Sequence, residues 1–197
     1  LLAVAFANLI APETYGTYKY ILSLAGLMAI FSLPGVNTAL ARATAQGQES
    51  SIHTATRTRV LSACIGSLVA LAGSAYYFAN ANTELALALL VIAATLPFFD
   101  TLTSYLFYFV GKRRFDLRTR YYALTQIAST FVLIATIFFT DDLLLILLAY
   151  FVPLTLIRAA LYWHFARTIP RSASREDDAE VRRYGFHLTA MQVLSTI

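Results

Sequence analysis

The sequence predicts an all-α membrane protein, a polytopic bundle of spanning helices, and three observations support this fold class. Of the 197 residues, 58% are hydrophobic and only 13% are charged, with a mean hydropathy of +0.64, which is more apolar than a soluble domain needs to fill its core. Five long runs carry at most one charge each. These runs lack the period-2 alternation of a membrane barrel, so they are expected to be helices.

The first element, Leu1 to Ala11, is uncharged but too short to span a bilayer, which takes roughly 20 helical residues. It also lacks the basic start and the cleavage site of a signal peptide. We expect it to be the tail of a membrane helix that starts before Leu1. Residues 184–197 likewise break off inside an apolar stretch, so the sequence is expected to be an internal fragment of a longer chain.

Five full-length spans are predicted between these two ends: residues 20–41, 60–79, 85–110, 121–139 and 143–165. Small residues at a four-residue spacing line one face of the second span, namely Ser62, Gly66, Ala70 and Ser74. Such a face lets another helix approach closely, although small residues are also common in membrane helices generally. Pro34-Gly35 and Pro153 are predicted to kink their helices, either to permit bending or as static features of packing.

The basic residues are distributed unevenly between the loops. Counted on alternate sides of the predicted spans, Lys19 stands alone on one side and the other 14 Lys and Arg residues lie on the other. The positive-inside rule therefore predicts that the basic loops are cytoplasmic and that the protein lies in the cell membrane. The densest loop, "GKRRFDLRTR", is expected to hold this topology and to contact anionic lipid through Lys112, Arg113, Arg114, Arg118 and Arg120.

A nucleic-acid site in that loop is not expected, because ten residues between two spanning helices offer no docking element. The longer polar segment, residues 167–183, is expected to be a cytoplasmic connector with a short surface helix capped by Ser174. This helix would lead directly into a further spanning helix that starts at about residue 184.

Motifs of soluble enzymes are absent from the sequence, which contains no G-x-G-x-x-G, P-loop, H-E-x-x-H or G-x-S-x-G. The single cysteine, Cys64, and three scattered histidines do not suggest a disulfide or a metal site. Neither enzymatic activity nor a cofactor is therefore expected.

Three stretches carry a resemblance to a known family: "LIAPETYGTYKYILSLAGLMAIFSLPGVNTALARATAQG", "YLFYFVGKRRFDLRTRYYALTQIASTFVLIATIFF" and "EVRRYGFHLTAMQVL". In their order and spacing they resemble the oligosaccharide flippases of polysaccharide biosynthesis, within the multidrug, oligosaccharidyl-lipid and polysaccharide exporter superfamily. The resemblance implies two six-helix lobes around a central cavity. Residues 1–166 would form the first lobe, and residues 184–197 would start the second lobe of the same chain. The second lobe would be an essential partner of the first, because the cavity is incomplete without it.

The resemblance further implies alternating access, in which a lipid-linked oligosaccharide enters from the cytoplasmic leaflet and leaves on the other side. Asp100 lies well inside a span, where a carboxylate either binds sugar hydroxyls or exchanges a proton, or else serves as a structural acid. Arg42 and Arg158 either bind a diphosphate near the cytoplasmic mouth or are boundary arginines that reach toward water. Asn37 and Gln126 either line the cavity or join helices.

Two other functions stay open at this point. A drug/cation antiporter of the same superfamily would use an acid such as Asp100 for ion coupling and would bind amphipathic cations. More distantly, the chain would be a non-transporting membrane scaffold or the anchor of a membrane enzyme. A full-length sequence that ends in a soluble domain would favour that last function over a transporter.

Overall fold

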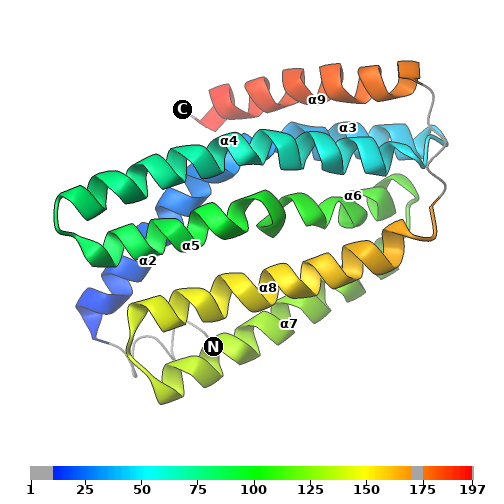
Figure 1. The fold of residues 1–197 in the computed structure, drawn as a ribbon. Helices are drawn as coiled ribbons and strands as arrows, with labels where there is room; N and C mark the ends of the chain where they lie inside the picture. Colours follow the sequence, from blue (N-terminus) through cyan, green and yellow to red (C-terminus); the bar gives the residue numbers. More distant parts are fainter. Residues whose placement is uncertain (1–10, 170–174, 197) are drawn as a thin grey trace.

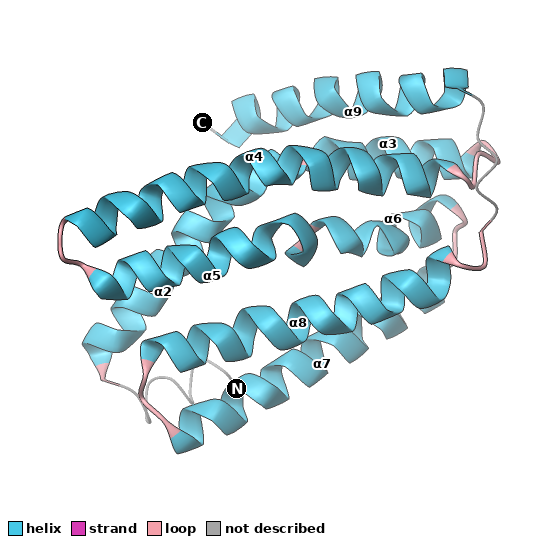
Figure 2. Cartoon of the chain, viewed as in Figure 1, coloured by secondary structure: helices cyan, strands magenta, loops and turns pink. Residues whose placement is uncertain are grey.

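The computed structural model describes residues 11–169 and 175–196, and in these ranges the regular elements are all helical (Figures 1 and 2). In chain order they are α2 (Pro12–Met28), η1 (Ala29–Ser32), α3 (Pro34–Ala45), α4 (Ser51–Ala79), α5 (Thr83–Phe99), η2 (Thr101–Thr103), α6 (Ser104–Gly111), α7 (Phe115–Phe139), α8 (Leu143–Ala166) and α9 (Arg175–Thr196). The predicted first stub, apart from Ala11, and the predicted cap Ser174 lie outside the described residues.

Four helical stretches of the described chain are long and apolar enough to cross a membrane: Ser51–Ala79, Thr83–Gly111, Phe115–Phe139 and Leu143–Ala166. The bent pair Pro12–Ser32 and Pro34–Ala45 makes a fifth if it is counted as one span. The protein is therefore a multi-pass helical membrane protein, as the composition predicts. The helices extend beyond the predicted apolar runs, because a helix continues through polar residues that leave the hydrocarbon region.

Two of the five spans are broken near one level of the bundle. Between η1 and α3 the chain bends by 47° at Leu33, which has a φ of 52°, and Pro34 follows without a backbone N–H to continue the helix. The predicted break at Pro34-Gly35 is therefore present, whereas α8 runs unbroken through Pro153. The second break follows Pro97, where α5 ends at Phe99 and η2 connects it to α6.

The predicted small-residue face of α4 packs against α5 and the first broken span. Gly66, Ala70 and Ser74 are all buried, and the Ser74 hydroxyl donates a hydrogen bond of 2.7 Å to the Ala86 carbonyl. A Cβ atom added at Gly66 would lie 2.8 Å from a methyl group of Leu96. The small side chains therefore permit the close approach that the sequence predicts.

The last helix, α9, lies along α3 and α4 at the edge of the bundle (Figure 1). Its contact with α3 is close, because a Cβ atom added at Gly35 would lie only 2.3 Å from the backbone nitrogen of Thr189. The Thr189 hydroxyl accepts a hydrogen bond of 3.0 Å from the Gly35 N–H. This bond satisfies one of the free N–H groups at the start of α3, where Leu33 provides no side-chain cap.

The bundle has two ends that differ in charge. The turns at residues 46–50, 112–114 and 167–169 lie at one end, here called the basic end, and the turns at 80–82 and 140–142 lie at the opposite end. The helix ends at the basic end carry most of the Lys and Arg residues.

Candidate functional site

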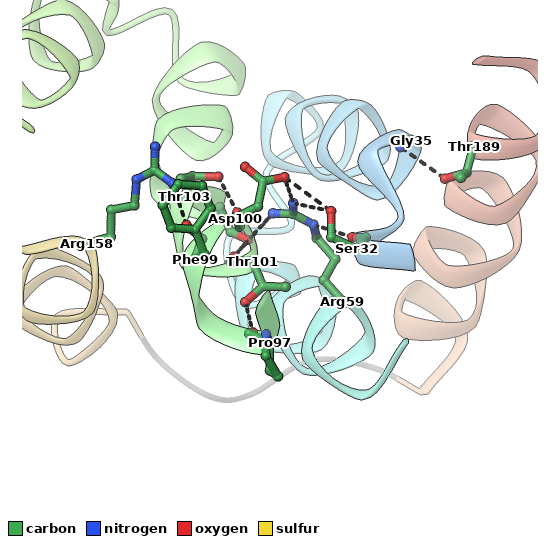
Figure 3. Close-up of polar contacts among 11 residues, drawn as sticks. Ser32, Gly35, Arg59, Pro97, Phe99, Asp100, Thr101, Thr103, Arg158 and Thr189 are labelled. Atoms are coloured by element: carbon green, nitrogen blue, oxygen red, sulfur yellow. Dashed lines mark hydrogen bonds and ion pairs between the residues drawn. The ribbon is translucent and has the colours of Figure 1, made fainter. Parts of the chain in front are cut away.

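A fully buried arginine connects the two helix breaks. Arg59 lies two turns inside α4 from the basic end, and its exposed fraction is 0%. Its Nε donates to the Ser32 carbonyl at 2.9 Å, and its Nη1 donates to the Thr101 carbonyl at 3.2 Å (Figure 3). Longer contacts of 3.4 and 3.5 Å reach the hydroxyls of Ser104 and Ser32. The guanidinium group is thus surrounded by acceptors from η1, η2 and α6.

This arrangement follows from the breaks themselves. Where a helix is interrupted, backbone carbonyls lose their helical N–H partners, and an unsatisfied carbonyl in an apolar interior is costly. Ser32 ends η1 and presents such a carbonyl to the unbroken helix α4, whereas the Thr101 carbonyl, at the start of η2, also accepts a hydrogen bond of 2.8 Å from the Ser104 hydroxyl. Arg59 supplies donors to both carbonyls, and its planar fork has enough N–H groups to do so at once.

Asp100 is the carboxylate partner of Arg59. Its Oδ2 accepts hydrogen bonds of 3.1 Å from Arg59 Nη2 and of 3.1 Å from the Ser32 hydroxyl. The Asp100 side chain is 38% exposed, whereas the Arg59 side chain has no exposure. One carboxylate oxygen is therefore held by two donors, and the buried arginine has the counter-charge that its burial requires.

A second arginine reaches the same level from α8. The Nη1 of Arg158 donates to the carbonyl of Phe99, the residue at which α5 ends, and the guanidinium carbon lies 4.6 Å from the centre of the Phe99 ring (Figure 3). Among the described residues, no carboxylate lies within 4.0 Å of the Arg158 guanidinium. The arginine layer, defined as Arg59, Asp100 and Arg158, thus holds two cations and one anion.

A cavity of about 270 Å³ borders this layer, between α2, α5 and α8. Asp100 and Phe99 form part of its wall, and most of the remaining wall is apolar. The arginine layer and the cavity together form the candidate site.

The other predicted site residues lie elsewhere. Arg42, in the last turn of α3, lies 4.0 Å from the Glu180 carboxylate and 4.8 Å from the Tyr184 ring centre, both in α9. Asn37 is buried in α3, and its Oδ1 has no hydrogen-bond partner among the described residues. Gln126 is exposed on the surface of α7. The structure brings together only Asp100 and Arg158 of these candidates.

The basic loop residues have partners of their own. Lys112 forms an ion pair with Glu49, which also accepts a hydrogen bond of 2.7 Å from the Tyr108 hydroxyl. The hydrogen bond from Lys112, and after it the one from Tyr108, holds the pKa of Glu49 below its usual range. Arg114 pairs with Asp116 at 3.2 Å. Arg118 lies 5.9 Å from the Phe107 ring centre, and Arg113 and Arg120 are exposed.

Arg59 is the functional candidate that the sequence did not single out. Because Arg59 is charged, the predicted apolar span starts one residue later, at residue 60, and Arg59 is predicted to be the last residue of the preceding loop. A signal was present, however, because Arg59 precedes Ser62 by three residues and Gly66 by seven. These spacings place it on the small-residue face of α4.

A comparison with protein-family models decides the family. The model described as "Polysaccharide biosynthesis protein" matches residues 1–197. The chain belongs to this family. This membership confirms the resemblance drawn from the three sequence stretches. No curated protein and no solved structure gives a significant match to the chain.

Proposed function

We propose that this chain is part of a flippase that carries a lipid-linked oligosaccharide across the cell membrane by alternating access, with its basic end in the cytoplasm. Two facts support the proposal: the chain belongs to a polysaccharide biosynthesis family, and it is a multi-pass membrane protein. Residues 1–166 form the first lobe in this proposal, residues 167–183 connect the lobes, and residues 184–197 begin the second lobe. The protein would move its substrate without chemical conversion and would need no cofactor.

The excess positive charge of the arginine layer is the observation that carries the proposal. Asp100 is bound to Arg59, and no described carboxylate pairs with Arg158. A phosphate group cannot enter hydrocarbon alone, so a carrier must offer it a cation at membrane depth. A guanidinium group suits this role because its N–H groups fork onto phosphate oxygens. Arg158 is the proposed phosphate contact.

The same geometry argues against the drug/cation antiporter. An antiporter would use Asp100 as a carboxylate that binds an incoming cation or a proton. Here one Asp100 oxygen already accepts from Arg59 and Ser32, and a second arginine lies on the neighbouring helix α8. An organic cation would have to approach a layer whose net charge is positive, which is unfavourable at low dielectric.

The other predicted pathway residues take secondary roles in this proposal. Arg42 would contact the start of the second lobe through Glu180 and Tyr184. Asn37 and Gln126 would line the path, Asn37 through its Oδ1, which has no hydrogen-bond partner among the described residues. The exposed Arg113, Arg118 and Arg120 would contact anionic lipid at the cytoplasmic surface.

The test is complementation of a flippase-deficient strain by the full-length protein, which includes the second lobe. We expect Arg158→Gln to lower export at least tenfold, since one charge-assisted contact of about 1.4 kcal/mol corresponds to a factor of ten. Arg158→Lys should retain part of the activity because it keeps the charge. Arg114→Gln, a loop arginine paired with Asp116, is the matched control and should export normally at equal abundance. Full export by Arg158→Gln would overturn the role of Arg158, and failure of the wild-type chain across several sugar pathways would overturn the proposed function.

A further inference from the structure

Asp100 lies between the two cations of the arginine layer. It directly follows α5, which packs against both α4, the helix of Arg59, and α8, the helix of Arg158. Figure 3 shows the two arginines on opposite sides of the Asp100 side chain. Asp100 pairs with Arg59 at 3.1 Å and lies more than 4.0 Å from the Arg158 guanidinium. The carboxylate is therefore committed to one arginine and leaves the other unpaired.

The two oxygens of this carboxylate differ in their contacts. Oδ2 accepts hydrogen bonds of 3.1 Å from Arg59 Nη2 and of 3.1 Å from the Ser32 hydroxyl, so two donors fix the orientation of the group. Among the described residues, none donates a hydrogen bond to Oδ1. The side chain is 38% exposed and forms part of the cavity wall. Asp100 thus keeps an open oxygen that a nearby anion would meet.

Arg158 is held next to the same segment of chain. Its Nη1 donates to the carbonyl of Phe99, the residue that precedes Asp100. The charge of Asp100 acts on the Arg158 guanidinium from this distance. A Coulomb interaction falls only with the inverse of distance, so it persists beyond ion-pair range where the dielectric is low. Asp100 therefore weakens the positive field around Arg158 without occupying its N–H groups.

This arrangement has two effects on a phosphate at Arg158. The N–H groups that Arg158 does not use for the Phe99 carbonyl are available to phosphate oxygens, but the same phosphate is repelled by Asp100. A carboxylate paired directly with Arg158 would block the contact, and a site without any carboxylate would hold the phosphate too tightly. A carrier must release what it captures, just as a channel must bind its ions weakly enough for them to leave.

We propose that Asp100 sets the anion affinity of this site: held away from Arg158 by Arg59 and Ser32, it weakens the binding of the substrate phosphate enough to permit release. The inference rests on the proposed function and names the residue that regulates its phosphate contact. Because the repulsion grows with the charge of the anion, Asp100 also makes the site discriminate against anions of higher charge.

Removing the charge of Asp100 tests the proposal. Asp100→Asn removes the repulsion and keeps an acceptor oxygen for Arg59, and Asp100→Ser is a second neutral variant in case the first folds poorly. Asp100→Glu keeps the charge and should show no gain in affinity. Asp116→Asn is the matched control, because it removes a carboxylate that pairs with Arg114 at the basic end.

The measurement is the Kd of inorganic phosphate and of pyrophosphate for the full-length protein in phosphatidylcholine nanodiscs at neutral pH. We expect both neutral variants to bind inorganic phosphate about tenfold more tightly than wild type. Pyrophosphate carries about twice the charge, so the repulsion lost is about twice as large and the gain should be about a hundredfold. Asp116→Asn should bind both anions as wild type does, and Arg158→Gln should weaken both.

The outcomes separate this inference from the proposed function. If the neutral variants bind phosphate no more tightly than wild type while Arg158→Gln weakens it, the inference is wrong and the phosphate contact stands. Equal gains for phosphate and pyrophosphate, or an equal gain in Asp116→Asn, would also overturn the inference, because neither follows from a local charge. If Arg158→Gln binds both anions as tightly as wild type, the phosphate contact of the proposed function is wrong and the inference fails with it.

Discussion

Two ion pairs in this protein join the same kinds of group in different surroundings. Arg59 and Asp100 pair inside the bundle, and Lys112 and Glu49 pair at the basic end. Arg59 has no exposed side-chain surface, whereas 33% of the Lys112 side chain is exposed. The strength of an ion pair therefore depends on what each partner would contact without the other. If Glu49 is removed, water can hydrate the exposed Lys112 ammonium group. The buried Arg59 guanidinium has no such access to water and depends on its partners within the bundle.

The largest effect is expected from removing the buried cation. Arg59→Leu would leave Asp100 without its ion-pair partner and the Ser32 carbonyl without the Arg59 donor, and the Thr101 carbonyl would keep the Ser104 hydroxyl as its side-chain donor. It should lower the free energy of unfolding by about 3–5 kcal/mol. Thermal unfolding in detergent micelles is the measurement. Arg57→Leu is the matched control, because Arg57 lies two residues earlier in α4 and is exposed. If Arg59→Leu and Arg57→Leu lower the stability equally, Arg59 has no special role in joining the helix breaks.

Removing the carboxylate should have a smaller effect. In Asp100→Asn, Arg59 keeps its contacts with the Ser32 carbonyl, the Thr101 carbonyl and the Ser104 hydroxyl, and the new amide oxygen can still accept a hydrogen bond. We expect a loss of about 1–3 kcal/mol in the same unfolding measurement. A loss as large as that of Arg59→Leu would mean that the carboxylate, and not the helix carbonyls, is the principal partner of Arg59.

The smallest effect is expected at the basic end, and it should depend on pH. Because Lys112 and Tyr108 lower the pKa of Glu49 from 4.5, the Glu49 carboxylate stabilises the fold above that pH, and the contribution is lost as pH falls through the lowered pKa. Glu49→Gln should therefore lower the free energy of unfolding by about 0.5 kcal/mol at pH 7, after allowance for solvent screening of this partly exposed pair. The difference from wild type should shrink below pH 4.5 and also in high salt.

Unfolding curves of wild type and Glu49→Gln at pH 7 and at pH 4, each with and without added salt, check this prediction. A stability difference that grows as the pH falls would contradict a stabilising role of the ionised Glu49 carboxylate. The stability difference for Arg59→Leu should change little with salt, because a buried pair is screened much less than an exposed one.

Much of the fold follows from local patterns in the sequence. The apolar runs predict the spans, the spacing of Ser62, Gly66 and Ala70 predicts a packed face, and Pro34 predicts a break. Asp100 and Arg158 could be selected because a charge within an apolar run is costly unless it has a function or a partner. Each of these inferences needs only neighbouring residues.

The partners of these residues could not be predicted in the same way. A hydropathy count places Arg59 at the boundary of a span. It assigns the charged side chain an unfavourable hydropathy and takes no account of the hydrogen-bond acceptors that surround it in the fold. Those acceptors come from η1 and η2, whose depth in the bundle depends on how α2 and α5 pack. Likewise, Arg42 contacts Glu180 and not the arginine layer because α9 lies along α3, which no local pattern reveals.

The hydrogen bond between Gly35 and Thr189 has a consequence for biosynthesis. The two residues are 154 positions apart, so the start of α3 is synthesised well before the side chain that caps it. At roughly 5–20 residues per second, the delay is about 8–30 s on the ribosome. During this interval another acceptor must satisfy the Gly35 N–H, and the contact between α3 and α9 forms only when α9 arrives.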